Sequence, residues 1–144
     1  MMEIILKNKE LTAAGEFLNK MELTATDSRH RSKVLTKLNE AIQSLGESDL
    51  ELATRYGKLD ENKRLIVQED GSFDLNSTED KATYMEERAI LLNEEVVIQA
   101  GMYEKNFAEF SRVLSEYNGI ISGESALIYD RLFDEFEMND KEKD

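Results

Sequence analysis

Apolar residues recur at helical spacing in two long stretches. In residues 28–59 they follow alternating steps of three and four, interrupted only by Asp49: Leu35, Leu38, Ile42, Leu45, Leu52, Tyr56 and Leu59. Residues 77–98 repeat the rhythm with Ala82, Met85, Ala89, Leu92 and Val96. Because side chains three and four apart share a helix face, each stretch should carry an apolar seam. The pattern predicts two long helices that fold back antiparallel through residues 60–76.

The first long helix contains a weak point at Gly46. A capping-box pattern follows at residues 48–51, so a new helix could begin there. The apolar phase nevertheless continues across Gly46 without a slip. This continuity favours one long helix, kinked or straight, over two separate helices.

Short apolar runs predict extended segments beside the helices. Residues 3–7 have strand character, and residues 64–67 and 72–75 flank an Asp70-Gly71 turn that is typical of a β-hairpin. Two strands alone are marginal in water, so the N-terminal strand or the apolar end of the second long helix should shield them. That end, residues 95–101, is β-branched, and its last turns could be extended instead.

Three further helices are predicted by shorter apolar stripes. Their apolar positions are Leu11, Ala14, Phe17, Leu18 and Met21, then Tyr103, Phe107, Phe110, Leu114 and Tyr117, and finally Ile128, Tyr129, Leu132, Phe133 and Phe136. The prediction is a mainly α fold, a bundle of about five helices around a long antiparallel helical hairpin, with a small β-hairpin. Residues 1–138 form a single helical domain, and residues 139–144 form a disordered acidic tail.

Composition narrows the class of protein. The 144 residues include no cysteine and no proline, and their net charge is −13. Residues 1–45 have a net charge of +1 and residues 46–144 one of −14. No stretch approaches the roughly 20 apolar residues of a membrane span, and the N-terminus is too short and too acidic for a signal peptide. A soluble cytoplasmic protein without disulfides is expected.

The sequence contains no recognisable catalytic or metal-binding motif. Its single histidine, His30, has no metal-binding partner in the pattern, and neighbouring carboxylates such as Glu86 and Glu87 do not face each other on a helix. A calcium loop that began at Asp70 would need glycine at its sixth position and glutamate at its twelfth, and those positions hold Leu75 and Lys81. We therefore expect no enzyme activity, cofactor or metal.

A basic cluster lies at the start of the first long helix. Arg29, Arg31, Lys33 and Lys37 crowd its first turns, where the helix dipole prefers anions. Pairing with acidic helices of the same chain would compensate for this. The functional alternative is a patch that binds an anion, a nucleic acid or an acidic partner.

Carboxylates of the last helix are the second candidate surface. Glu124, Asp130, Asp134, Glu135 and Glu137, with Glu47, Asp49 and Glu51, could form an acidic face. Duplex DNA carries one charge per roughly 1.7 Å of axis, so such a face could imitate DNA and occupy a basic DNA-binding groove.

Four segments together resemble a known family. They are EIILKNKEL at residues 3–11, SRHRS at 28–32, DGSF at 70–73, and SGESALIYD at 122–130 with the preceding Leu114-x-x-Tyr117. The chain is similar over nearly its whole length to small phage and prophage proteins of Gram-positive bacteria, domain-of-unknown-function family 1617. The resemblance implies a viral origin and a host-cytoplasm setting, and it implies no activity or catalytic residue.

Two functional hypotheses follow. The first is a non-enzymatic protein that binds and modulates a protein of the host or phage machinery, such as a basic DNA-binding enzyme, with DNA mimicry as one mode. The alternative is a nucleic-acid accessory protein that binds through the basic cluster. A membrane partner is not expected, and a homodimer is compatible with the helical seams.

Overall fold

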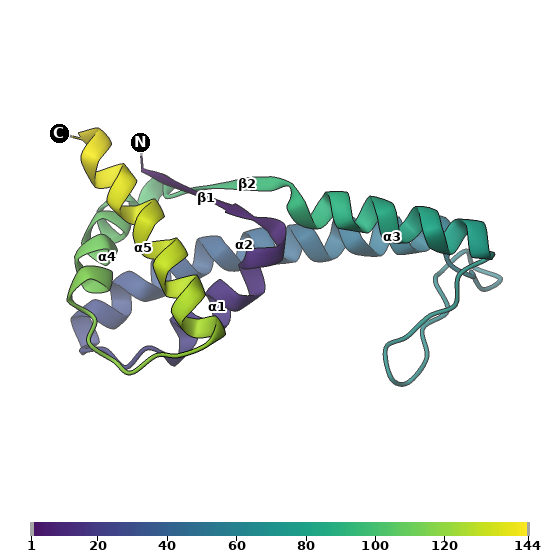
Figure 1. Cartoon of the computed structure of the whole chain (residues 1–144), viewed down its shortest axis with the longest axis horizontal. Helices are drawn as coiled ribbons and strands as arrows, with labels where there is room; N and C mark the ends of the chain where they lie inside the picture. Colours follow the sequence, from purple (N-terminus) through teal and green to yellow (C-terminus); the bar gives the residue numbers. More distant parts are fainter. Residues whose placement is uncertain (1, 144) are drawn as a thin grey trace. The chain divides into compact units, whose positions relative to one another are not determined.

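The elements of the chain are mostly helical. The computed structural model describes residues 2–143, with side chains to residue 139 (Figure 1). The elements are β1 (Glu3–Lys7), α1 (Leu11–Lys20), α2 (Ala25–Tyr56), α3 (Thr78–Asn93), β2 (Glu95–Gln99), α4 (Glu104–Glu116) and α5 (Glu124–Lys143), with 3-10 turns at Asn8–Glu10 and Gly101–Tyr103. The prediction of a mainly α fold with about five helices and a minor β part is confirmed, and the β part is the antiparallel pair β1 and β2. Helix α2 runs through Gly46 without a break.

The described residues form two compact units. Unit 1 contains Met1–Ile42 and Glu95–Asp144, and unit 2 contains Gln43–Glu94. Helix α2 contributes its first part to unit 1 and its second part to unit 2. The single domain over residues 1–138 stays a prediction.

The hydrophobic core lies in unit 1. Its fully buried side chains include Phe107 and Phe110 of α4 and Phe136 of α5. The Phe136 ring lies 5.9 Å from the Phe107 ring and 5.4 Å from the Phe110 ring, centroid to centroid. The aromatic seams predicted for these two helices therefore meet each other, and they supply much of the apolar area removed from water.

Strands β1 and β2 pair antiparallel in unit 1, side by side in Figure 1. Glu3 lies opposite Gln99 and Lys7 lies opposite Glu95. Ile4, Leu6 and Ile98 are buried, whereas Glu3, Ile5 and Val97 on the other face are partly or fully exposed. This alternation is what one covered sheet face produces.

The outer edge of β1 is closed by side chains of α5. Arg131, Glu135 and Asn139 lie four residues apart, on one helix face. The Ile5 amide donates to Glu135 Oε1 at 2.7 Å, and Arg131 Nη2 donates to the Ile5 carbonyl at 2.8 Å. The Glu3 amide donates to Asn139 Oδ1 at 3.1 Å, and Asn139 Nδ2 donates to the Glu3 carbonyl. Helix α5 thus replaces the missing third strand of the sheet.

The second long helix is shorter than the predicted range 77–98. It ends at Asn93, and the β-branched residues that follow form β2. The extended alternative for this segment is confirmed. The reason is that β1 offers Val96, Val97 and Ile98 a backbone partner, and strands accommodate their stiff branched side chains better than helices do.

The β-hairpin predicted at residues 64–67 and 72–75 is wrong as a pair of strands. Its turn is present: the Gly71 amide donates to the Gln68 carbonyl at 2.9 Å, with Gly71 at φ +85°. The flanking runs form only isolated bridges, from Leu65 to Leu59 and from Leu75 to Gly57. Ile66 and Val67 stay exposed, so a hairpin here would bury too little to be stable.

The end of α5 differs from the tail predicted at residues 139–144. The helix continues to Lys143, and the Asn139 side chain is buried against β1. Asn139 belongs to unit 1 because it bonds to both Glu3 and the Glu135 carbonyl. Asp144 and the side chains of residues 140–143 lie outside the described residues.

Removing the Glu135 carboxylate should destabilise the protein. Glu135→Ala leaves the Ile5 amide without its acceptor and Arg131 without its closest carboxylate, 2.9 Å away. We expect a loss of about 1–3 kcal/mol in the free energy of unfolding, measured by urea denaturation followed by circular dichroism.

Asp134→Ala is the matched control, because Asp134 is adjacent in sequence and exposed. It should change the free energy of unfolding by no more than about 0.5 kcal/mol. If the two substitutions lowered the free energy of unfolding equally, the contact of Glu135 with β1 would not stabilise the protein.

Candidate protein-binding groove

Unit 2 is a pair of antiparallel helices held by polar contacts. The Tyr56 hydroxyl of α2 donates to Glu87 Oε1 of α3 at 2.9 Å, and Arg88 Nε lies 3.2 Å from Asp49 Oδ1. Helix α3 begins at an N-cap, Ser77, whose side chain accepts from the Asp80 amide at 3.0 Å. The antiparallel pairing predicted for these two stretches is present within the unit.

The connection between the two helices is anchored at Gly57. A Cβ atom there would lie 2.4 Å from Leu65 Cδ1 and 2.8 Å from the Ala53 carbonyl oxygen, so only glycine allows this approach. The Lys58 amide donates to the Asp74 carbonyl at 2.9 Å, and the Asn76 amide donates to the Tyr56 carbonyl at 3.0 Å. These bonds fix where α3 begins relative to the end of α2.

Most of the apolar seam predicted for α3 is exposed, although Leu92 is half-buried and Val96 lies in β2. Ala82, Met85 and Ala89 are exposed, and Met85 retains 60% of its surface. The face toward α2 carries Glu87 and Arg88 instead, because these side chains find partners there. Polar pairs therefore lie on the side of α3 toward α2, together with the half-buried Leu91, whereas Ala82, Met85 and Ala89 are exposed.

Unit 2 buries very little apolar surface. Within residues 43–94, Ala53 is the only buried apolar side chain, and α3 has none. Six large apolar residues of the unit are exposed: Leu50, Leu59, Ile66, Val67, Met85 and Ile90. Exposed apolar residues indicate a contact surface where they lie together in one patch, and of these six Ile90 lies in a groove of the unit.

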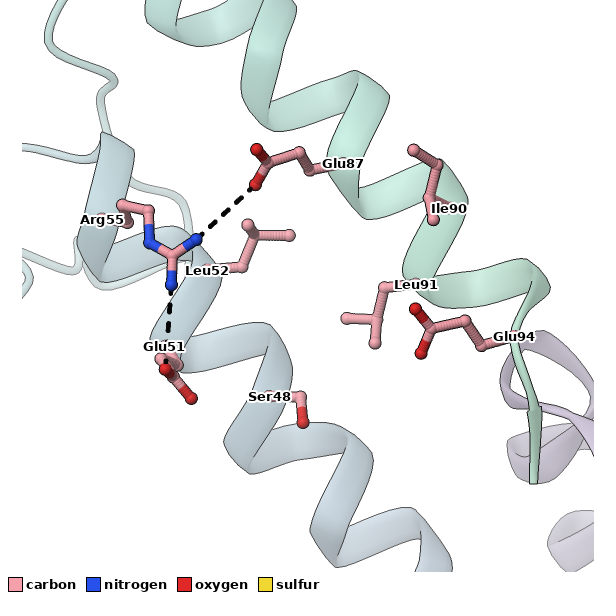
Figure 2. A pocket seen from close by; sticks show the side chains of 8 residues that line it. All are labelled: Ser48, Glu51, Leu52, Arg55, Glu87, Ile90, Leu91 and Glu94. Atoms are coloured by element: carbon pink, nitrogen blue, oxygen red, sulfur yellow. Dashed lines mark ion pairs between the residues drawn. The ribbon is translucent and has the colours of Figure 1, made fainter. Parts of the chain in front are cut away.

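An open groove of about 310 Å³ runs between the two helices of unit 2 (Figure 2). One wall carries Ser48, Glu51, Leu52 and Arg55 of α2, and the other carries Glu87, Ile90 and Leu91 of α3 and Glu94, which follows the end of α3. Both sets have the spacing i, i+3, i+4, i+7, so each is a single helix face. Leu52 and Leu91 are half-buried, whereas Ile90 is 59% exposed.

Carboxylates dominate the rim of this groove. Glu51, Glu87 and Glu94 surround the apolar side chains, and Arg55 is the single cation. Arg55 lies 3.9 Å from Glu51 and 4.0 Å from Glu87, both long and exposed ion pairs (Figure 2). Contacts of this kind contribute little to stability, so these carboxylates remain available to an incoming cation. The groove combines an apolar floor with a negative rim.

The negative charge of Glu87 also changes the pKa of the Tyr56 phenol. Its hydrogen bond to Glu87 raises its pKa above the ordinary value, and desolvation and the Glu87 charge act in the same direction. The bond requires the phenol to keep its proton, and the carboxylate repels the phenolate.

The predicted basic cluster is divided in the structure. Arg31 turns toward α1, where it donates to the Leu18 carbonyl at 3.1 Å and to the Met21 carbonyl. It thereby satisfies carbonyls at the C-terminal end of that helix. Lys33 and Lys37 lie over the Tyr103 ring, at 5.1 and 5.8 Å from its centroid.

Arg29, the remaining member of the cluster, is exposed. The adverse dipole at the start of α2 is met partly by Asp27 in its first turn. Asp27 also lies 2.8 Å from Arg112 of α4, and this and two further carboxylates raise the pKa of the Arg112 guanidinium.

The predicted acidic face is only partly assembled. Asp130, Asp134 and Glu137 are exposed and lie four and three residues apart, so they share one face of α5. Glu124 is exposed near the start of the helix, away from this stripe. Glu135 is committed to Ile5 and Arg131, so it belongs to the fold.

Sequence reasoning found only part of the groove. The stripe in residues 28–59 identified Leu52, but the seam assigned to α3 passed over Ile90 and Leu91. Glu87, Ile90, Leu91 and Glu94 do repeat at i, i+3, i+4, i+7. This second stripe contains two glutamates and two apolar residues, so a search for apolar periodicity alone does not find it.

Comparison with known proteins identifies a family without an assigned activity. The family described as "Protein of unknown function (DUF1617)" matches residues 2–143. No curated protein and no solved structure matches the chain significantly. None of the described helices is long and apolar enough to span a membrane.

Replacing Glu87 should move the titration of Tyr56. In Glu87→Gln the pKa of Tyr56 should fall toward its ordinary value, because both the carboxylate acceptor and its charge are lost. Carbon-13 labelling at the tyrosine ζ position resolves the phenols individually in an NMR pH titration.

Glu86→Gln removes the same charge from an exposed neighbour that does not contact Tyr56. It should leave the titration nearly unchanged. A Tyr56 pKa that responds equally to both substitutions would contradict the contact between the helices.

Proposed function

The chain belongs to the DUF1617 family of proteins of unknown function, and we propose that it is a non-enzymatic module that binds another protein. The bound element is a basic amphipathic helix, seated in the groove between α2 and α3 of unit 2. The observation that carries this proposal is an apolar floor with a carboxylate rim, in a unit whose own core is nearly absent.

The shape of the groove suits a helix. Two antiparallel helices leave an elongated furrow, and amphipathic helices dock into such furrows through apolar residues at i, i+3, i+4 and i+7. Leu52 and Ile90 lie on opposite walls, where one row of apolar side chains would contact both. Covering Ile90 would remove from water much of a side chain that is now mostly exposed.

The charge of the groove selects a basic partner. Residues 43–94 contain thirteen acidic and six basic side chains, a net charge of −7. A second copy of this unit would oppose like charges, whereas Lys or Arg beside the docked apolar row would face Glu51, Glu87 and Glu94. Complementary charge of this kind favours the encounter and rejects acidic competitors.

The biological setting is part of the proposal. A phage or prophage origin and a host-cytoplasm location, which the family resemblance suggested, fit a small modulator of host or phage machinery. A basic DNA-binding enzyme has the charge that the groove requires. DNA mimicry by α5 stays a prediction, and the exposed carboxylates on one face of that helix are Asp130, Asp134 and Glu137.

The alternative of nucleic-acid binding receives less support. Arg31 is occupied by carbonyls of α1, and Lys33 and Lys37 lie over Tyr103. Of the four predicted cations, only Arg29 is exposed, and the other three are half-buried. One exposed arginine on an acidic protein is a weak basis for contact with a phosphate backbone.

A synthetic helix tests the proposal directly. The probe is a fluorescent peptide of about 18 residues with leucine on one face and lysine on the other. It should bind the full chain at low salt and dissociate as salt rises, and Ile90→Asp should weaken binding by about tenfold or more, measured by fluorescence anisotropy.

Val67→Asp is the control, because it adds the same charge at an exposed apolar residue outside the groove. It should leave the affinity unchanged, and a peptide with glutamate in place of lysine should not bind. Absence of binding by the lysine peptide, or equal losses in Ile90→Asp and Val67→Asp, would reject the groove as the site.

A further inference from the structure

In unit 1, side chains form hydrogen bonds to the outer edge of β1, whereas the outer edge of β2 has no strand beside it among the described residues. Side chains of α5 occupy the outer edge of β1 at Glu3 and Ile5, and the Lys7 amide donates to Glu10 Oε1 at 2.8 Å. The opposite edge belongs to β2, which pairs with β1 alone among the described strands. An edge strand with unpaired backbone groups is a template for another strand.

The backbone groups on the outer edge of β2 follow from the phase of the ladder. The Ala100 amide donates to the Met2 carbonyl at 3.0 Å, which makes these opposite residues a hydrogen-bonded pair. Such pairs alternate along antiparallel strands, so Ile98 and Val96 also bond toward β1. Glu95, Val97 and Gln99 therefore direct their amides and carbonyls outward, and no described side chain bonds to them.

A groove of about 350 Å³ lies along this edge. It is lined by Val96, Val97, Ile98 and Gln99 of β2, by Gly101, and by Lys37, Glu40 and Ala41 of α2. Lys37 Nζ lies 3.5 Å from Glu40 Oε2, so the wall opposite the strand has no net charge. The wall favours an uncharged strand over a strongly basic or acidic one.

Most of the usual protections of an edge strand are absent from β2, whose one charged residue, Glu95, lies at its end. Its sequence EVVIQ contains no proline and no lysine, and it pairs with β1 without a bulge. Val97, at its centre, is 48% exposed. Natural proteins usually block such an edge with charge, proline or a covering element.

We propose that β2 pairs with β2 of a second copy of this chain. The strands run antiparallel about a two-fold axis at Val97 and extend the two-stranded sheet to four strands. In this register Val97 faces Val97 of the partner copy, and Glu95 faces Gln99 at both ends. All three outward residues then join hydrogen-bonded pairs, which gives about six backbone bonds.

The side chains favour this register over its neighbours. EVVIQ has a polar residue at each end and three β-branched residues between them, so it matches itself when reversed. The glutamine amide can donate to the opposing carboxylate, and β-branched residues oppose each other at the centre. A shift that centred the axis on Glu95 would oppose two carboxylates and would leave Gln99 unpaired.

This pairing does not depend on the groove of unit 2, and salt separates the two. Copies that each have a charge of −13 repel one another, so salt should strengthen the dimer, whereas it weakens binding of a basic helix. Sedimentation equilibrium of the full chain over about 0.05–0.5 M salt should show a monomer–dimer equilibrium that shifts toward dimer.

Variants at Val97 test the edge itself. Val97→Pro removes an amide that points away from β1, so the ladder to β1 is retained while pairing between copies is lost. Val97→Thr keeps the amide and the branched shape, and it should dimerise like the unmodified chain. A monomeric unmodified chain at all salts, or a Val97→Pro variant that still dimerises, would overturn the proposal.

A single cysteine reports the register, because the chain has none of its own. Opposite residues of a hydrogen-bonded pair have Cα atoms about 5.5 Å apart, within reach of a disulfide. Val97→Cys should form a covalent dimer under mild oxidation. Met102→Cys, at a more exposed residue outside β2, should not; equal cross-linking of the two would refute the pairing.

Discussion

The contact between α5 and the outer edge of β1 holds the two ends of the chain together. Three side chains spaced four residues apart supply hydrogen bonds that a third strand would otherwise provide. Buried backbone groups at the edge of a sheet require partners, and natural proteins often cover such an edge with another element. Here the same helix also contributes Phe136 to the core, so edge closure and core packing depend on one element.

The two units differ in how much apolar surface each of them buries. Unit 1 contains nearly all the buried apolar side chains, from Met2 to Phe136, so burial of its own core stabilises it. Unit 2 has two helices joined by polar contacts and leaves six of its large apolar residues exposed. A unit of that kind gains most from a partner, because the partner supplies the apolar surface that its own helices lack.

Local pattern predicted most of the helices and little of the site. The stripes in residues 103–117 and 128–136 identified the helices of the core, since burial there follows apolar periodicity. The strand at residues 95–99 was ambiguous because its partner begins at residue 3, and no local signal shows that pairing. The face of α3 was mispredicted because Glu87 and Arg88 are oriented by partners on α2.

Charged residues were hardest to interpret from sequence, since the same carboxylate can serve the fold or a partner. Glu135 and Asp134 are neighbours, yet one bonds to the backbone of β1 and the other is exposed. Arg31 similarly caps α1, whereas Arg29 is exposed. Only the position of the opposing backbone, set by contacts distant in sequence, distinguishes the members of each pair.

Amide hydrogen exchange measured by NMR on dilute protein tests the central claim most directly, because it compares the two sheet edges residue by residue. If side chains of α5 close the edge of β1, the Ile5 amide should exchange at least about tenfold more slowly than the Val97 amide in the monomer. Equally fast exchange at both positions would contradict the account, because the edge of β1 would then be as open as that of β2.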